Sequence, residues 1–358
     1  MKFIINKMLF NNVISNTSPY VDKKDISSIT SHILIEAKDG TLNVRATDYE
    51  IGLKYKVKNL NIQVEGSATA NVSTLLSILK GLKDEDIIVE TMNNFLFIRQ
   101  GKSKFKLPMY NSLDFPQFPE IGNKKKFEID SNSFARGLKK IFPTIDTNHP
   151  NFALNGAFVD IKENSINLVG TDGRRMGLYT IEGKNEVLPN ENYLNIPKRA
   201  INEMQKLFFD SVEIYYDESS LIAISENFEF FTKLINRKFP DYERAIPKEI
   251  AHVLTLPRDK FLEGMKTISM VCEKMKITIK PNSLIFESIS EDNSEAKTEI
   301  ELVNDVVSDL NLRITNRYIF DFLNSIENIH FKLEYNNEES AFLVSSDGLI
   351  NVIMPTIL

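Results

Sequence analysis

The sequence has few of the residues that carry disulfide, redox or zinc chemistry. It contains one cysteine, Cys272, among 358 residues, so no disulfide can form within the chain. The four histidines stand far apart, and none has the spacing of a zinc site with that cysteine. They are His32, His149, His252 and His330. We therefore expect neither a metal nor a redox cofactor in this protein.

Long apolar runs and an excess of basic residues are also missing. No run approaches the roughly 18 apolar residues that span a bilayer, and Lys7 interrupts the apolar opening segment before a secretory signal could form. These features predict a cytoplasmic protein without membrane contact. The formal net charge of −6 argues against a protein that is basic all over for nucleic acid, although it is compatible with a local basic patch.

Composition and length predict several folded domains. Hydrophobic residues make up 42% and charged residues 26%, which is ordinary for globular proteins and unlike disordered chains. At roughly 150 residues per domain, a chain of 358 residues predicts two or three domains and excludes a single small module.

The chain repeats itself at an offset of 124 positions. Residues 42–48 (LNVRATD) resemble residues 166–172 (INLVGTD), and Pro116 and Pro240, each after a phenylalanine, keep the same offset. Nearly three repeats of this size fit the chain, with a restart at 253–257. Proline-rich stretches close the first two repeats. The predicted domains are 1–121, 122–249 and 250–358.

Each repeat shows the patterns of two helices and of antiparallel strands. Alternating apolar residues over 42–46 and 51–57 predict two strands, which the turn at 38–40 joins as a hairpin. The spacing of apolar residues predicts helices over 7–20, 72–83, 132–143, 197–208, 257–276 and 316–325. The sequence thus predicts an α+β protein of three similar domains, each with two helices packed on antiparallel sheets.

The predicted helices are more basic than the rest of the chain. Together they carry a net charge of +10, whereas the remaining residues carry −16. Charged residues favour exposed helix faces whatever the function, so a basic face on one helix would mean little. None of the six helices is negative, however. Such a surface would attract phosphates without reading base sequence.

Several short motifs stand in an order that resembles a known family. They are the ATD of 46–48, GTDGRR over 170–175, RKFPDY over 237–242 and VIMP over 352–355. Together they resemble the bacterial sliding clamp, the β subunit of DNA polymerase III, over essentially the whole chain. The resemblance implies a non-catalytic processivity factor that encircles double-stranded DNA of any sequence. It also implies a head-to-tail homodimer, closed into a ring of six similar domains with helices lining the hole.

The resemblance implies several client proteins and a pocket for them. The clients are the DNA polymerase III catalytic subunit, the clamp loader, and other DNA polymerases and repair proteins, which bind through short apolar motifs. The pocket residues implied are Leu154, Thr171, Gly173, Arg174, Arg175, Met176, Pro240, Arg244, Ala245, Ile353, Met354, Pro355 and Leu358. Many relatives carry a basic residue where this sequence has Thr356 and Ile357, so no ionic contact from the tail is implied.

The resemblance also indicates surfaces for dimerisation and for DNA. Phe105 and Leu107 would face the region of Met270 in a second copy, although their alternation equally fits core residues of their own domain. The DNA contacts implied are Lys24, Asn148, Lys198 and Arg199, and the helix charge adds Lys80, Lys139 and Lys140.

Two other functions are weighed against a clamp. An enzyme is disfavoured because the sequence has no phosphate-binding loop or nucleophile elbow. The repeated Asp48 and Asp172 could suggest paired metal sites, but the repeat itself explains them. A multi-domain protein-interaction scaffold without DNA encirclement would show no preference for circular DNA.

Overall fold

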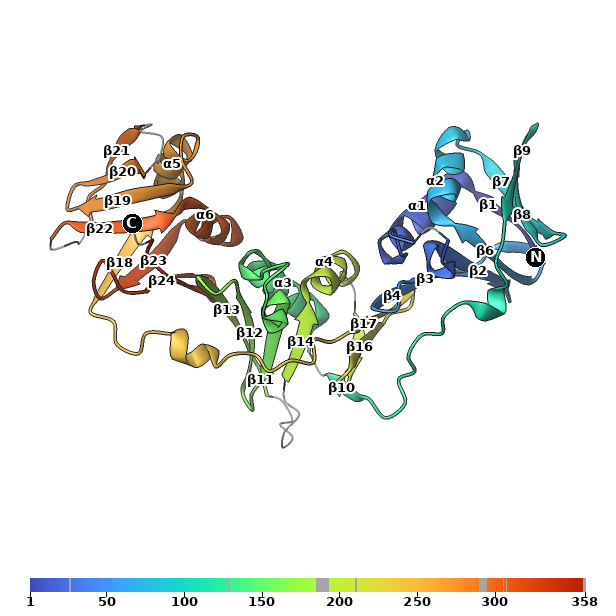
Figure 1. Ribbon diagram of the computed structural model, residues 1–358, viewed down its shortest axis with the longest axis horizontal. Coiled ribbons are helices and arrows are strands. Elements are labelled where there is room, and N and C mark those ends of the chain that lie inside the picture. The colour runs from blue at the N-terminus through green and yellow to red at the C-terminus, as the bar shows by residue number, and fades with distance from the viewer. Residues whose placement is uncertain are drawn as a thin grey trace. The chain divides into compact units, whose positions relative to one another are not determined.

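The protein is described by a computed structural model that covers residues 1–25, 27–127, 129–184, 193–209, 211–289, 295–304, 306 and 308–356. The chain divides into two compact units, and each sheet lies within one of them (Figure 1). The first unit comprises 1–129 and 210–233, and the second comprises 130–209 and 234–358. Each unit is described by itself below.

Two antiparallel sheets build the first unit. In spatial order the five-stranded sheet consists of β5 (Asn61–Val64), β1 (Lys2–Asn6), β7 (Asp86–Met92), β8 (Phe95–Gln100) and β9 (Ser103–Pro108). The eight-stranded sheet consists of β10 (Lys125–Phe127), β15 (Glu213–Tyr216), β16 (Ser220–Ile224), β17 (Phe228–Lys233), β4 (Ile51–Val57), β3 (Thr41–Thr47), β2 (His32–Lys38) and β6 (Gly66–Asn71). The pairing of β17 with β4 joins strands of the first and second repeats into one sheet.

Two helices pack side by side in the first unit (Figure 1). They are α1 (Lys7–Thr17) and α2 (Val72–Gly81), with short 3₁₀ turns at η1 (Ser18–Tyr20), η2 (Ile29–Ser31) and η3 (Ser112–Asp114). An asparagine side chain caps each helix: Asn6 accepts from the first backbone N–H groups of α1, and Asn71 does the same for α2. Phe10 and Leu75 are fully buried and anchor the two helices in the core.

Two further antiparallel sheets build the second unit. The eight-stranded sheet consists of β14 (Tyr193–Pro197), β11 (Gly156–Ile161), β12 (Ser165–Thr171), β13 (Arg175–Glu182), β25 (Leu349–Ile353), β24 (Phe342–Ser346), β23 (His330–Tyr335) and β18 (His252–Pro257). The four-stranded sheet consists of β21 (Lys297–Glu301), β20 (Ser283–Ile289), β19 (Lys274–Lys280) and β22 (Leu310–Thr315). Here β25 pairs with β13 as β17 pairs with β4.

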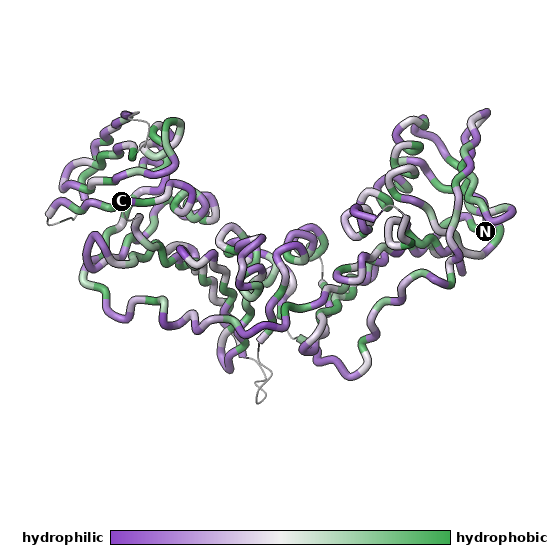
Figure 2. Tube along the Cα trace, in the orientation of Figure 1, coloured by the Kyte–Doolittle hydropathy of each residue, from purple (hydrophilic) through white to green (hydrophobic). Residues whose placement is uncertain are grey.

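Four helices belong to the second unit. They are α3 (Ser131–Ile141), α4 (Lys198–Leu207), α5 (Arg258–Ser269) and α6 (Asn316–Ser325), with 3₁₀ turns η4 (Phe142–Thr144), η5 (Phe152–Asn155) and η6 (Tyr242–Ala245). The helices pack in pairs, α3 with α4 and α5 with α6. Figure 2 shows hydrophobic and hydrophilic residues mixed along both the strands and the helices. No helix among the described residues is both long and apolar enough to cross a membrane.

The predicted repeat is present in the structure. The strands β3 and β12 start 124 residues apart, and so do the helices α1 and α3. Each of the three repeats contributes two helices and a set of antiparallel strands, as the sequence predicts. The prediction of an α+β protein with three similar parts is therefore confirmed.

Two sequence-based assignments are wrong. The turn at 38–40 joins β2 to β3, whereas β3 and β4 are joined by residues 48–50. The predicted helix over 257–276 ends at Ser269, and Lys274–Lys280 is a strand. The segment reads KMKITIK, in which Met275, Ile277 and Ile279 alternate with polar residues, and this period of two is typical of a strand. Two lysines thereby leave the helical surface.

Candidate functional site

The turn between β12 and β13 is held by its own side chains. The hydroxyl of Thr171 donates to the carbonyl oxygen of Arg175 at 2.7 Å. The Asp172 Oδ1 atom accepts from the backbone N–H groups of Arg174 and Arg175 at 3.0 Å each. Gly173 adopts a left-handed φ of +82°, which costs glycine little. These contacts make residues 171–175 a tight turn.

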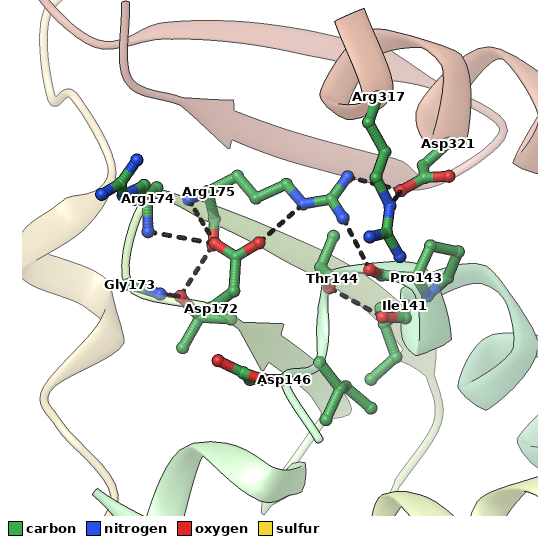
Figure 3. Close-up of polar contacts among 12 residues, drawn as sticks. Ile141, Pro143, Thr144, Asp146, Asp172, Gly173, Arg174, Arg175, Arg317 and Asp321 are labelled. Atoms are coloured by element: carbon green, nitrogen blue, oxygen red, sulfur yellow. Dashed lines mark hydrogen bonds and ion pairs between the residues drawn. The ribbon is translucent and has the colours of Figure 1, made fainter. Parts of the chain in front are cut away.

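The side chain of Arg175 lies inside the second unit (Figure 3). It is 4% exposed, and its Nε atom lies 3.1 Å from Asp172 Oδ2. Its Nη2 atom donates to the carbonyl oxygen of Pro143 at 2.7 Å, and its Nη1 atom lies 2.7 Å from Asp321 Oδ2 on α6. Arg175 thus ties the turn to η4 and α6. We infer that it positions the neighbouring turn.

An apolar cluster lies beside the turn and draws on several elements. Leu154 of η5 and Met176 of β13, both predicted from the sequence, belong to it. The other buried members are Ala153, Val169, Leu178, Phe239, Tyr242, Leu343 and Val352. Sequence reasoning missed these residues. Phe239, Tyr242 and Val352 stand within the motifs that carried the resemblance. Their apolar side chains in those motifs were the signal that could have identified them as members of the cluster.

Most other predicted pocket residues stand close in sequence to members of this cluster. Gly173, Arg174, Pro240, Arg244 and Ala245 are exposed, and Thr171 and Pro355 are half-buried. The side chain of Met354 is 50% exposed, and its backbone N–H donates to the carbonyl oxygen of Arg174 at 3.1 Å. Ile353 is fully buried. Leu358 lies outside the described residues.

A polar network holds η6 against the sheet. The hydroxyl of Tyr242 donates to Asp160 at 2.6 Å and accepts from the side-chain amide of Asn167 at 3.0 Å. Burial, together with the hydrogen bond to Asp160, raises the pKa of Tyr242 to about 12. The hydrogen bond to Glu243 raises the pKa of Lys162, which also lies 3.6 Å from Asp160. These contacts fix the segment after Pro240 beside the apolar cluster.

The predicted DNA-binding residues divide into two groups. Five of them are exposed: Lys24, Lys80, Lys139, Asn148 and Arg199. The other two use their ammonium groups within the second unit. Lys140 Nζ donates to the carbonyl oxygen of Asp347 at 2.9 Å, and Lys198 Nζ donates to that of Ile145 at 2.5 Å. Burial lowers the pKa of both lysines, and their internal bonds leave them less available for phosphate.

The predicted dimer residues lie on or near sheet edges. Strand β9 is an edge of the five-stranded sheet, and there Leu107 is buried while Phe105 is half-buried. Met270 directly follows α5 and is 85% exposed. Helix α5 packs against β21, which is the edge strand of the four-stranded sheet.

No group of three or more His, Cys, Asp or Glu residues in the described part of the chain could hold a metal ion.

Comparison with known proteins identifies the family. The N-terminal, central and C-terminal domains of the DNA polymerase III beta subunit match residues 1–119, 128–241 and 243–356. A beta sliding clamp of Helicobacter pylori is 34% identical over 351 residues, which cover 96% of this chain and 94% of that protein. A beta sliding clamp of Caulobacter vibrioides is 25% identical, with 99% of each chain covered.

A solved structure agrees along the whole chain. The crystal structure of the Helicobacter pylori beta clamp bound to a DNA ligase peptide covers 100% of both chains, with a TM-score of 0.94 at 32% sequence identity. The sequence motifs, the three repeats and these comparisons lead to one assignment. The chain belongs to the beta sliding clamp family, the beta subunits of DNA polymerase III.

Proposed function

We propose that this chain closes into a head-to-tail dimer around duplex DNA and holds client proteins at the apolar cluster beside the 171–175 turn. Its family membership makes it a DNA sliding clamp, a non-catalytic processivity factor of DNA replication that binds DNA and polymerase. We place its domain boundaries at 1–121, 122–249 and 250–358, and its site of action in the cytoplasm, with the DNA.

The way the repeats join supports ring closure. In the first unit β17 pairs with β4, and in the second unit β25 pairs with β13. By position in the repeat, β9 corresponds to β17 and β25, and β21 corresponds to β4 and β13. Both β9 and β21 are sheet edges in this chain. Pairing β9 of one copy with β21 of another would repeat the same joint and remove both exposed edges.

A short extended peptide suits the client site. The beta clamp of Helicobacter pylori was solved with a DNA ligase peptide bound to it. In this chain Leu154 and Met176 belong to the apolar cluster, and the exposed Gly173, Pro240 and Met354 stand close in sequence to its members. Clients of this site are the polymerase III catalytic subunit, the clamp loader, and other polymerases and repair proteins, each docking an apolar anchor.

The exposed cations support DNA contact without base reading. Lys139 and Arg199 lie on α3 and α4, which pack together in the second unit. Arg136 is also exposed, one turn before Lys139, and extends the basic face of α3 beyond the predicted residues. Side chains of this kind bind phosphate, so contact with DNA should weaken as salt rises.

The proposal rests on the repeated strand pairing between successive repeats, β17 with β4 and β25 with β13. A single variant tests it. Met270→Glu places a charge at an 85% exposed position, so the chain should fold while the dimer dissociates. Ile329→Glu, at a 70% exposed position, is the matched control. We expect Met270→Glu alone to sediment as a monomer and to lose retention on nicked circular DNA after loading. Equal retention of the parent on circular and linear DNA would instead support a scaffold without encirclement.

A further inference from the structure

The first unit contains a pocket at the same place in the repeat as the client site in the second unit. Its volume is about 350 Å³, and three aromatic side chains, two prolines and one lysine line most of it. These six are Tyr49, Phe118, Phe231, Pro116, Pro119 and Lys233. Pro116 stands 124 positions before Pro240 of the client site, and Phe118 stands the same distance before Tyr242.

The turn beside this pocket has the same backbone construction as the client-site turn. The Thr47 hydroxyl donates to the carbonyl oxygen of Ile51 at 2.9 Å, as Thr171 does to Arg175. The Asp48 Oδ1 atom accepts from the backbone N–H of Ile51 at 3.1 Å. The strand register also corresponds, because Thr232 lies opposite Ile51 as Ile353 lies opposite Arg175. The two pockets are therefore built on one scaffold.

Tyr49 occupies the position that Gly173 holds in the other turn. Its φ is +71°, a left-handed conformation that is uncommon and costly for a bulky residue. Its side chain is nevertheless 56% exposed at the pocket, so burial of the ring does not offset the backbone cost. Backbone strain of this kind gathers at binding sites, where it holds a side chain in place for a ligand.

One charge distinguishes this pocket from the client site. Lys233 is the charged residue of its lining, and by register it replaces Met354. Its Nζ atom lies 2.9 Å from Glu50 Oε1, and the two side chains are 54% and 67% exposed. Such an exposed pair contributes little, so a carboxylate from a ligand could take the place of Glu50.

We propose that this pocket binds a second linear segment of a partner protein, an extended peptide with an aromatic anchor and a neighbouring carboxylate. The anchor enters between Tyr49 and Phe118, and the carboxylate pairs with Lys233. The size of the pocket is at the lower end of the range of ligand sites, which suits one large side chain and its flanking backbone. The proposal does not depend on ring closure, because every lining residue belongs to the first unit.

The test uses the full chain and the synthetic probe acetyl-Ser-Asp-Bpa-Leu-Ser-amide, in which Bpa is the photoreactive benzoylphenylalanine. After irradiation, mass spectrometry maps the adducts on the protein. We expect saturable labelling within 45–53, 112–120 or 217–233. Tyr49→Gly should lower this labelling at least fivefold and leave labelling of the second unit unchanged. Asn59→Gly, at another left-handed and exposed position of the first unit, is the matched control and should change neither.

The charge contact has its own test. Replacing the probe's aspartate by asparagine should lower labelling of the first unit about threefold in the parent, and Lys233→Met should remove that difference. Labelling confined to the second unit, or labelling that rises without saturation, would overturn the proposal. If the Tyr49→Gly variant had a different oligomeric mass from the parent, the proposal would be overturned, and a second copy of this chain would be the ligand of the pocket. None of these results bears on retention on circular DNA, so the proposed clamp function is judged separately.

Discussion

The β17–β4 joint of the first unit and the β25–β13 joint of the second share a backbone but are filled differently. In the first, Phe231 lies opposite Gly52, and a Cβ atom built on that glycine would lie 2.3 Å from the phenylalanine ring. In the second, Val352 lies opposite Met176. A large ring over a glycine thus corresponds to a smaller side chain facing a larger one. The two pairings therefore place the larger side chain on opposite strands, on β17 in the first unit and on β13 in the second.

The two joints also differ in how they are anchored. Ile51 is 2% exposed and packs as an apolar residue, whereas its counterpart Arg175 carries a buried guanidinium that contacts Asp172 and Asp321. A buried ion pair adds little net stability compared with apolar packing, but it is costly to break. Arg175 forms an ion pair with Asp321 on α6, whereas the apolar side chain of Ile51 can form none.

The largest expected effect comes from converting the second joint to the first. Arg175→Ile leaves Asp172 without its ion-pair partner and Asp321 with only the exposed Arg317. We expect the free energy of unfolding of the second unit to fall by about 3 kcal/mol. Hydrogen exchange of the β13, β25 and α6 amides measures it. Arg317→Ala is the control, because Arg317 is 73% exposed and also contacts Asp321, at 3.4 Å. Equal losses for the two variants would contradict the comparison.

The complementary filling of the joints can be tested by exchange. Gly52→Met should destabilise the first unit by about 2 kcal/mol, because the new side chain clashes with Phe231. Phe231→Val alone should also destabilise it, by leaving a cavity. Combined, the two changes should cost at least about 1 kcal/mol less than their sum. Strict additivity in denaturant unfolding would show that the two side chains do not compensate each other.

Glycine should be the more stable residue in both turns, because both positions have a left-handed backbone. Gly173→Ala should lower the stability of the second unit by about 1 kcal/mol, since only a left-handed backbone penalty is involved. The nearest atom to the new Cβ would be His149 Nε2 at 3.7 Å, so no clash contributes. Tyr49→Gly should raise the stability of the first unit by a similar amount. A loss of stability in Tyr49→Gly would mean that the tyrosine ring contributes more packing than its exposure indicates.

The smallest effect concerns pH. The pKa of Tyr242 is raised to about 12 by burial and by its bond to Asp160, above the ordinary value of 10. The folded state therefore holds this proton more tightly, and the stabilisation present below pH 10 is lost as the pH rises toward 12. The counterpart Phe118 cannot titrate. We expect the difference in melting temperature between the parent and Tyr242→Phe to change between pH 9.5 and 11.5, and a constant difference would contradict this.

Local pattern predicted much of the fold. The 124-residue offset located β3 and β12, and the spacing of apolar residues located the helices α1 and α3. The assignment of the turn at 38–40 failed because the same alternation fits β2, β3 and β4, and a short-range pattern does not say which pair a given turn connects.

The site was harder to predict than the fold. Gly173 stands in the recognised motif and Met176 directly follows it, but the burial of Arg175 depends on Pro143 and Asp321, which belong to other parts of the chain. The pocket in the first unit requires the register of β17 on β4, a pairing between strands of different repeats that no local pattern encodes. The sequence shows the aromatic residues of this pocket, but it does not show that they come together in the fold.

The late pairing of the joint strands affects how the chain is made. Strand β4 can pair with β17, and β13 with β25, only after the ribosome has added about 170 further residues. At 5 to 20 residues per second, a nascent chain exposes an open, largely apolar strand edge for roughly 10 to 30 seconds in each case. We expect ribosome-bound chains that stop before β17 or β25 to need chaperone cover, and the rate of elongation to influence the yield of folded protein.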